Sequence, residues 1–124
     1  MTAYILGQEY NDLHWGTRMP VALMIGSDYF EVRARGDCSL AVQDIQKLQA
    51  QIPDPEDLTA YLGSLLSSSI TDVIGELSTQ VSNIAQLTVV TEQTVNALQS
   101  NLEPKCSELG LKIKSLKIEA IESI

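Results

Sequence analysis

The chain has 124 residues and a formal net charge of −8, with 8 Lys and Arg against 16 Asp and Glu. This length suits one domain, which would bury roughly two thirds of its unfolded surface. The acidic balance disfavours nucleic acid as a partner, because phosphate binding needs clustered positive charge. No apolar run approaches the roughly 18 residues that span a bilayer, and the N-terminus lacks a secretory signal, which together favour a cytoplasmic location.

The first third of the chain is predicted to form strands. Residues 2–6 are expected as a short strand and residues 7–13 as a polar connection. The apolar run 21–25 is followed by the turn residues Gly26-Ser27-Asp28 and an alternating run over 29–42, which predicts a hairpin. One face of the second run is apolar, with Phe30, Val32, Ala34 and Cys38, and the other polar, with Glu31, Arg33, Arg35 and Asp37. Gly36 interrupts the alternation, and we expect a bulge or bend there.

Helices are predicted over the middle of the chain. A short helix is expected over 45–51, and Pro53-Asp54-Pro55 would stop it and begin the next one, with Asp54 as the N-cap. Nine apolar residues then recur at helical spacing: Leu58, Tyr61, Leu62, Leu65, Leu66, Ile70, Val73, Ile74 and Leu77. A further short helix is expected to start at Ser82, and Thr91 would cap another that carries Pro104 and stops at Gly110.

The last predicted element is a strand over residues 111–124. Its apolar phase changes near Ser115, so that a bulge or twist is needed to keep one face buried. Because the strands are separated by about 70 residues of helix, the expected fold class is α+β, a mostly antiparallel sheet with helices packed on one face. An exposed sheet edge would be able to pair with other chains.

Several short motifs carry a family resemblance: Trp15-Gly16-Thr17, Asp28-Tyr29, Arg33-Ala34-Arg35-Gly36 with Asp44 beyond it, and Leu109-Gly110-Leu111 before the last strand. In this pattern the chain resembles the SPFH or band 7 family of stomatins, prohibitins and flotillins. It resembles most closely the soluble bacterial branch that is described as virion-core-like. The resemblance covers residues 2–124 and implies structural roles for Trp15, Gly16, Gly36 and Gly110.

The resemblance also carries expectations about organisation and function. It implies one SPFH/band 7-like core domain over residues 1–124. Because two opening strands and the long helical region of the family have no counterpart, we expect an excised fragment of a longer chain. The implied function is a non-catalytic scaffold that forms homo-oligomers and organises or recruits proteins at a membrane surface, cytoplasmic and peripheral to the membrane. The alternative is a soluble adaptor whose acidic helices bind a protein partner, since residues 55–109 hold seven acids and one Lys.

The sequence contains no recognisable catalytic, cofactor-binding or metal-binding motif. His14 is the only histidine, and Cys38 and Cys106 have neither zinc-ligand nor disulfide spacing, so we expect two buried thiols and an exposed histidine. The serine motifs of hydrolases and the glycine-rich loops that bind phosphates are absent from the sequence. We therefore expect no catalytic, cofactor-binding or metal-binding residues and no cofactor.

Two groups of basic residues are candidates for contacts with a partner. Arg33 and Arg35 lie two residues apart on one strand face, where they either grip an anionic partner or lipid head group or meet acids on a neighbouring strand. Lys112, Lys114 and Lys117 form a small basic patch or protect a strand edge. Trp15 is either an interface anchor or, as we expect, a core residue.

Overall fold

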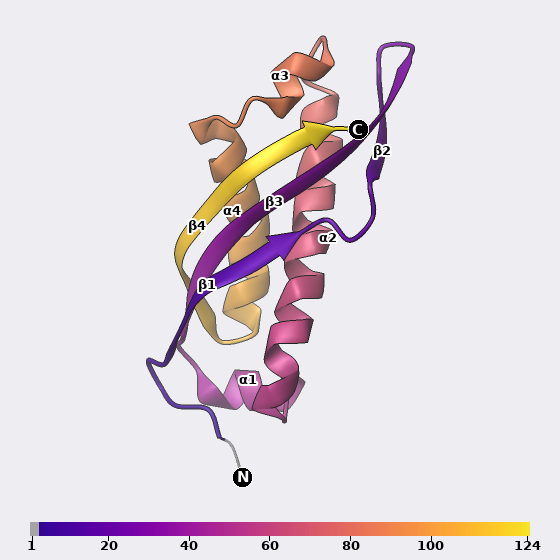
Figure 1. The fold of residues 1–124 in the computed structure, drawn as a ribbon. Coiled ribbons are helices and arrows are strands. Elements are labelled where there is room, and N and C mark those ends of the chain that lie inside the picture. The colour runs from indigo at the N-terminus through magenta and orange to yellow at the C-terminus, as the bar shows by residue number, and fades with distance from the viewer. Residues whose placement is uncertain (1–2) are drawn as a thin grey trace.

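Four strands form one antiparallel sheet around a long central strand. The structure is a computed structural model that describes residues 3–124 (Figure 1). Its strands are β1 (Glu9–Gly16), β2 (Val21–Ile25), β3 (Asp28–Val42) and β4 (Leu111–Ser123). One side of β3 pairs with β2 over residues 28–32 and with β1 over 35–41, and the other side pairs with β4 over 32–42. The predicted β2–β3 hairpin is confirmed.

All the helices lie on one face of this sheet. The chain leaves β3 through α1 (Ile45–Gln51) and a single 3₁₀ turn (Pro55–Asp57), and continues into α2 (Leu58–Ser78), α3 (Ile84–Thr88) and α4 (Glu92–Glu108). Figure 1 shows α2 and α4 side by side behind the sheet, with α1 and α3 at opposite ends. The expected class, α+β with helices packed on one face of an antiparallel sheet, is therefore confirmed.

The core fills the space between the sheet and the two long helices. Strand β3 alternates as predicted, because every second residue from Val32 to Leu40 is buried. The helices face these residues with side chains that are almost fully enclosed, among them Leu62, Leu66, Ile70, Leu98 and Leu102. Trp15 is 4% exposed and belongs to this core, which confirms the expectation of a core anchor. The burial of these side chains is the main source of stability in such a domain.

The predicted helix boundaries follow from capping. Asp54 Oδ1 accepts a hydrogen bond from the Glu56 N–H at 3.0 Å, but it caps the 3₁₀ turn, and α2 begins after that turn. Thr91 caps α4 and forms a reciprocal capping box with Thr94. Pro104 neither splits nor ends this helix, which runs as one element to Glu108. Gly110 closes it with a φ of +81°, in the left-handed region that favours glycine.

Both expected irregularities of the sheet are present. The register between β3 and β4 shifts once between Arg35 and Gly36 and again between Ser39 and Leu40. In each case the extra residue lies on β4, first Glu119 and then Lys114 next to the predicted phase change at Ser115. Gly36 is needed here for packing, because a Cβ atom would come within 2.5 Å of the Trp15 ring.

Three sequence predictions are wrong. Residues 3–6 form no strand and residue 2 lies outside the described residues, while the predicted connection over 7–13 contains most of β1. The reason is a bulge between Tyr10 and Leu13, where Asp12 has a φ of +55°, which breaks the alternation that marks a strand. The helical spacing predicts Tyr61 in the buried stripe of α2, but Tyr61 is 42% exposed, because the helix turns it away from the sheet.

Candidate functional site

The sheet face opposite the helices carries the predicted interaction residues. Side chains that are register partners on neighbouring antiparallel strands point to the same face. Arg33 is opposite Glu122, Arg35 is opposite both Gly16 and Ala120, and Asp37 is opposite His14 and Lys117. No helix covers this face within residues 3–124 (Figure 1). We refer to it as the open face.

A hollow of about 300 Å³ lies in the middle of the open face. The small residues Gly16 and Ala120 leave room between β1, β3 and β4, and the side chains of Arg33 and Arg35 border it. Thr17, Ala34 and Glu122 complete the lining. The hollow exists because β1 and β4 place the small residues Gly16 and Ala120 on either side of Arg35 on β3.

The two arginines differ in their partners. Arg35 binds two carboxylates of β4, with its Nη1 atom 3.2 Å from Glu122 Oε1 and its Nε atom 3.5 Å from Glu119 Oε1. Arg33 has no ion-pair partner among residues 3–124. For Arg35 the pairing with acids on a neighbouring strand is confirmed, whereas Arg33 remains available to a partner on the solvent side.

The three lysines of β4 do not form one patch with the arginines. Lys114 Nζ lies 3.8 Å from Glu9 Oε1 of β1, and Lys117 is opposite Asp37 on the open face. Lys112 borders a different hollow, between the start of β4 and α4, together with Glu103 and Gln99. Each lysine has an acidic residue in its surroundings, so this region offers little net positive charge to an anionic surface.

An exposed apolar pair lies at the hairpin end of the open face. Met24 of β2 and Tyr29 of β3 are register partners and are 54% and 60% exposed. The Tyr29 hydroxyl donates a hydrogen bond to Glu31 Oε1 at 2.9 Å, and this bond raises the pKa of the tyrosine. The sequence predictions do not include this pair, although the alternation of β2 indicates it, since Met24 lies between the inward-facing Leu23 and Ile25.

The groups with chemical reactivity do not converge. His14 Nδ1 hydrogen-bonds Asp37 Oδ1 on the solvent side of the sheet, and the histidine side chain is 83% exposed. Cys38 and Cys106 are buried, as predicted, and burial raises the pKa of Cys38 to about 12 and that of Cys106 to about 11. Both thiols are therefore neutral at physiological pH and poor nucleophiles.

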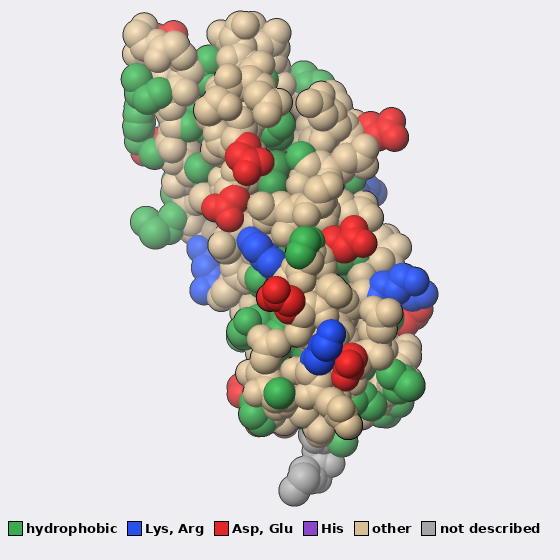
Figure 2. All heavy atoms as spheres, turned by 180° about the vertical axis from the view of Figure 1, so that it is seen from behind, with side chains coloured by type: hydrophobic (Ala, Val, Ile, Leu, Met, Phe, Trp, Pro, Cys, Tyr) green, Lys and Arg blue, Asp and Glu red, His purple; other side chains and the backbone are tan. Residues whose placement is uncertain are grey.

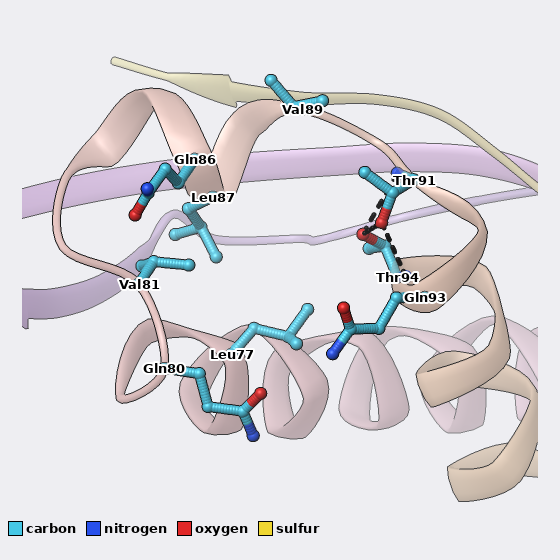
Figure 3. Close-up of a pocket in the computed structure, with 9 residues that line it drawn as sticks. All are labelled: Leu77, Gln80, Val81, Gln86, Leu87, Val89, Thr91, Gln93 and Thr94. Atoms are coloured by element: carbon cyan, nitrogen blue, oxygen red, sulfur yellow. Dashed lines mark hydrogen bonds between the residues drawn. The ribbon is translucent and has the colours of Figure 1, made fainter.

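The helical side has a smaller pocket, of about 170 Å³, at the end of the molecule where α3 lies (Figure 3). Figure 3 shows Leu77, Val81 and Leu87 directed into this space, with Gln93 at its edge. The Thr91 and Thr94 side chains, which also line it, bond each other in the capping box of α4. None of its nine lining residues carries a charge and five of them are polar, so the pocket has the size and chemistry for a small neutral group.

The outer face of the helices is polar, and acidic and basic side chains are interspersed on it (Figure 2). Asp72, Glu76, Glu92 and Glu103 are exposed there, and Figure 2, which views this side, shows carboxylates spread over it without a single cluster. Lys105 Nζ is 3.8 Å from Asp72 and donates to Ser69 Oγ and Asn101 Oδ1, each at 3.1 Å. Ser69 is buried inside α2, and the hydrogen bond from Lys105 gives its hydroxyl the partner that a buried polar group needs.

Comparison with known families gives one result. The model of the SPFH domain–Band 7 family matches residues 2–123, almost the whole chain. No curated protein matches the sequence. Across residues 3–124, none of the helices has both the length and the apolar character that crossing a membrane requires.

Proposed function

Because the chain belongs to the SPFH domain–Band 7 family, we propose that it is a non-catalytic scaffold domain that self-associates and recruits or organises proteins at a membrane surface. The family match over residues 2–123 is the observation that carries this proposal. The finer assignment to the bacterial virion-core-like branch rests on Trp15-Gly16-Thr17 and Arg33-Ala34-Arg35-Gly36. With this assignment we propose a cytoplasmic location at the periphery of the membrane.

The distribution of side chains supports a scaffold over an enzyme. A catalytic site brings a nucleophile, an acid or base and a stabilising group to one place, normally in a concave and partly dry environment. Here His14 lies on an exposed sheet face, and both thiols are held neutral inside the core. By contrast, the open face offers a hollow, an unpaired arginine and exposed apolar side chains, which are features of a contact surface.

The charge distribution indicates how membrane association would work. Arg35 and Lys114 are paired with acids, and the whole chain carries a net charge of −8. A bilayer rich in anionic lipid repels such a chain except where basic residues face it, and stable electrostatic attachment takes about four to eight of them. We therefore propose that this domain binds a membrane weakly as a single copy, and that assembly into oligomers multiplies the weak contacts.

A soluble adaptor is the second candidate. The observation that favours it is the set of exposed carboxylates on α2 and α4, two helices that carry one basic residue, Lys105, although Arg18 also lies beside α2. A basic or helical partner would bind there, on the side of the molecule away from the open face, and no membrane would be involved.

Sedimentation with liposomes separates the two proposals. The chain is mixed with phosphatidylcholine vesicles, with and without phosphatidylserine, and its mass in solution is measured in parallel by light scattering. The scaffold proposal expects an oligomer and a vesicle-bound fraction that grows with protein concentration. A folded protein that stays monomeric and never sediments with vesicles would leave the adaptor as the better account.

A further inference from the structure

We infer that the open face is a contact between two copies of this chain, in which the Met24–Tyr29 pair of each copy enters the hollow of the other. This inference rests on the self-association proposed above and assigns it to named residues. Three features of one sheet face carry it: an exposed apolar pair, a hollow that lies over Gly16 and Ala120, and Arg33, which has no ion-pair partner among residues 3–124.

Among residues 3–124, neither member of the Met24–Tyr29 pair belongs to the hydrophobic core or packs against it. Met24 and Tyr29 lie side by side on β2 and β3 and expose more than half of their surface, while the next residues along each strand, such as Leu23, face the core. Large apolar side chains exposed together on a strand pair are unfavourable in water unless a partner covers them. Tyrosine is also among the residues enriched at the centres of protein interfaces.

The hollow has a suitable size and chemistry to receive this pair. Its volume of about 300 Å³ lies over Gly16 and Ala120, and Arg33 and Arg35 border it. An aromatic ring that enters there would stack against a guanidinium, a contact worth about 0.5–2 kcal/mol depending on how dry it is. Within residues 3–124, no side chain of the domain itself closes the hollow.

The spacing along β3 allows both insertions at once. Tyr29 and Arg35 are six residues apart on the same strand face, which corresponds to about 20 Å. If a two-fold axis passes near residue 32, residue 29 of one copy faces residue 35 of the second copy, and the reverse insertion occurs at the same time. Such reciprocity is what a symmetric dimer interface requires.

The charges favour this antiparallel arrangement of the two β3 strands over a parallel one. With the axis near residue 32, Glu31 of each copy faces Arg33 of the second copy, and this supplies the carboxylate partner that Arg33 lacks among residues 3–124 of its own chain. If the two β3 strands ran in the same direction without a shift, Glu31 would face Glu31 and Arg33 would face Arg33. Like charges in contact disfavour that packing.

The first experiment measures the dimer dissociation constant by analytical ultracentrifugation of the native chain and two variants. Tyr29→Asp places a charge on the pair and is expected to raise the dissociation constant at least about tenfold. Met19→Asp is the matched control, because Met19 is 77% exposed and lies outside the open-face pair, in the turn between β1 and β2. Equal dissociation constants for the two variants would overturn the inference.

Charge reversal tests the predicted contact between Glu31 and Arg33. Glu31→Arg and Arg33→Glu are each expected to weaken the dimer, because two like charges then meet at each end of the contact. The double variant E31R/R33E restores opposite charges between copies and should recover most of the affinity. Lack of recovery, with circular dichroism showing a folded protein, would contradict this orientation of the two chains.

Cross-linking tests whether Tyr29 of one copy lies near Ala120 of the second copy, and it does so without weakening the contact first. Tyr29→Cys and Ala120→Cys are prepared as separate proteins, mixed, and treated with a short bis-maleimide. The native thiols of Cys38 and Cys106 are buried and do not compete. We expect a covalent dimer in the mixture and much less in either protein alone, and Ser115→Cys, on the same strand but away from the hollow, serves as the control for Ala120→Cys.

The outcomes distinguish this inference from the proposed function. A chain that associates with unchanged affinity in Tyr29→Asp and without cross-links would refute the open-face contact but leave the scaffold proposal intact. A chain that stays monomeric at every concentration would refute both.

Discussion

The two faces of β3 have different roles, although they alternate residue by residue along one strand. On the helix side Val32, Ala34, Cys38 and Leu40 are buried against α2 and α4. On the open side Arg33 and Arg35 lie in or beside ionic contacts that water can reach. The comparison indicates that folding stability depends on the first face, and that the second is free to serve recognition. Substitutions on the two faces should therefore differ in kind as well as in size.

The largest effect is expected in the helix layer that covers the buried face. Leu98 of α4 is completely buried, and Leu98→Ala would leave a cavity that lowers the free energy of unfolding by about 3 kcal/mol. Urea denaturation monitored by circular dichroism measures this loss. Tyr61→Ala on the exposed side of α2 is the control and should cost less than about 1 kcal/mol. Similar losses for both would remove the distinction between the faces of the helix layer.

Gly36 tests the packing where β1, β3 and β4 meet. The Cβ atom of Gly36→Ala would come within 2.5 Å of the Trp15 ring, so the strands must shift, at a cost of about 2 kcal/mol. Gly75→Ala in α2 is the matched control, because no atom lies within 4 Å of its Cβ and alanine favours the helix. We expect thermal denaturation to show a lower midpoint for the first variant and an equal or higher one for the second.

Alkaline pH probes the buried thiols on the core side. Unfolded cysteines ionise near pH 8.5, whereas burial raises the pKa of Cys38 to about 12 and of Cys106 to about 11. A raised folded-state pKa gives stability that is complete below the unfolded pKa and is lost as pH rises towards the folded pKa. The free energy of unfolding should thus fall above about pH 9, and the slope should be smaller in Cys38→Ala than in the native chain. Equal slopes would show that the thiol of Cys38 ionises freely in the folded state.

The smallest effect on stability is expected on the open face. Arg35→Gln removes two ion pairs whose side chains are all more than half exposed, and it should cost less than about 1 kcal/mol. Added salt should reduce the difference between the native chain and the variant, because exposed ion pairs are screened. A loss as large as that of Leu98→Ala, measured by the same urea titration, would show that the open face also supports the fold.

Much of the architecture could be predicted from local patterns. The β2–β3 hairpin follows from Gly26-Ser27-Asp28 between two apolar runs, and α4 follows from Thr91 as a cap and Gly110 as a stop. Strand β1 could not be recognised, because the bulge at Asp12 places Tyr10 and Leu13 on one face at an irregular spacing. A bulge depends on the neighbouring strand, and the sequence of one segment does not reveal it.

The candidate site was predicted only in part. The placement of Arg33 and Arg35 on one strand face followed from alternation, but the partners of Arg35 depend on the register with β4, which two bulges determine. The hollow joins Gly16, Arg33 and Ala120, which are far apart in the sequence, so only the folded sheet brings them together. The Met24–Tyr29 pair was the part that alternation alone could have revealed.

The most direct test of the account is the mass of the folded chain in solution, measured by light scattering over a wide range of concentrations. The account predicts a mass that rises with concentration from that of one chain, 13.6 kDa, towards at least twice this value. Addition of salt should shift the rise to higher concentration, because ion pairs contribute to the contact. A mass that remains that of a single chain throughout would contradict the central claim that this domain is a self-associating scaffold.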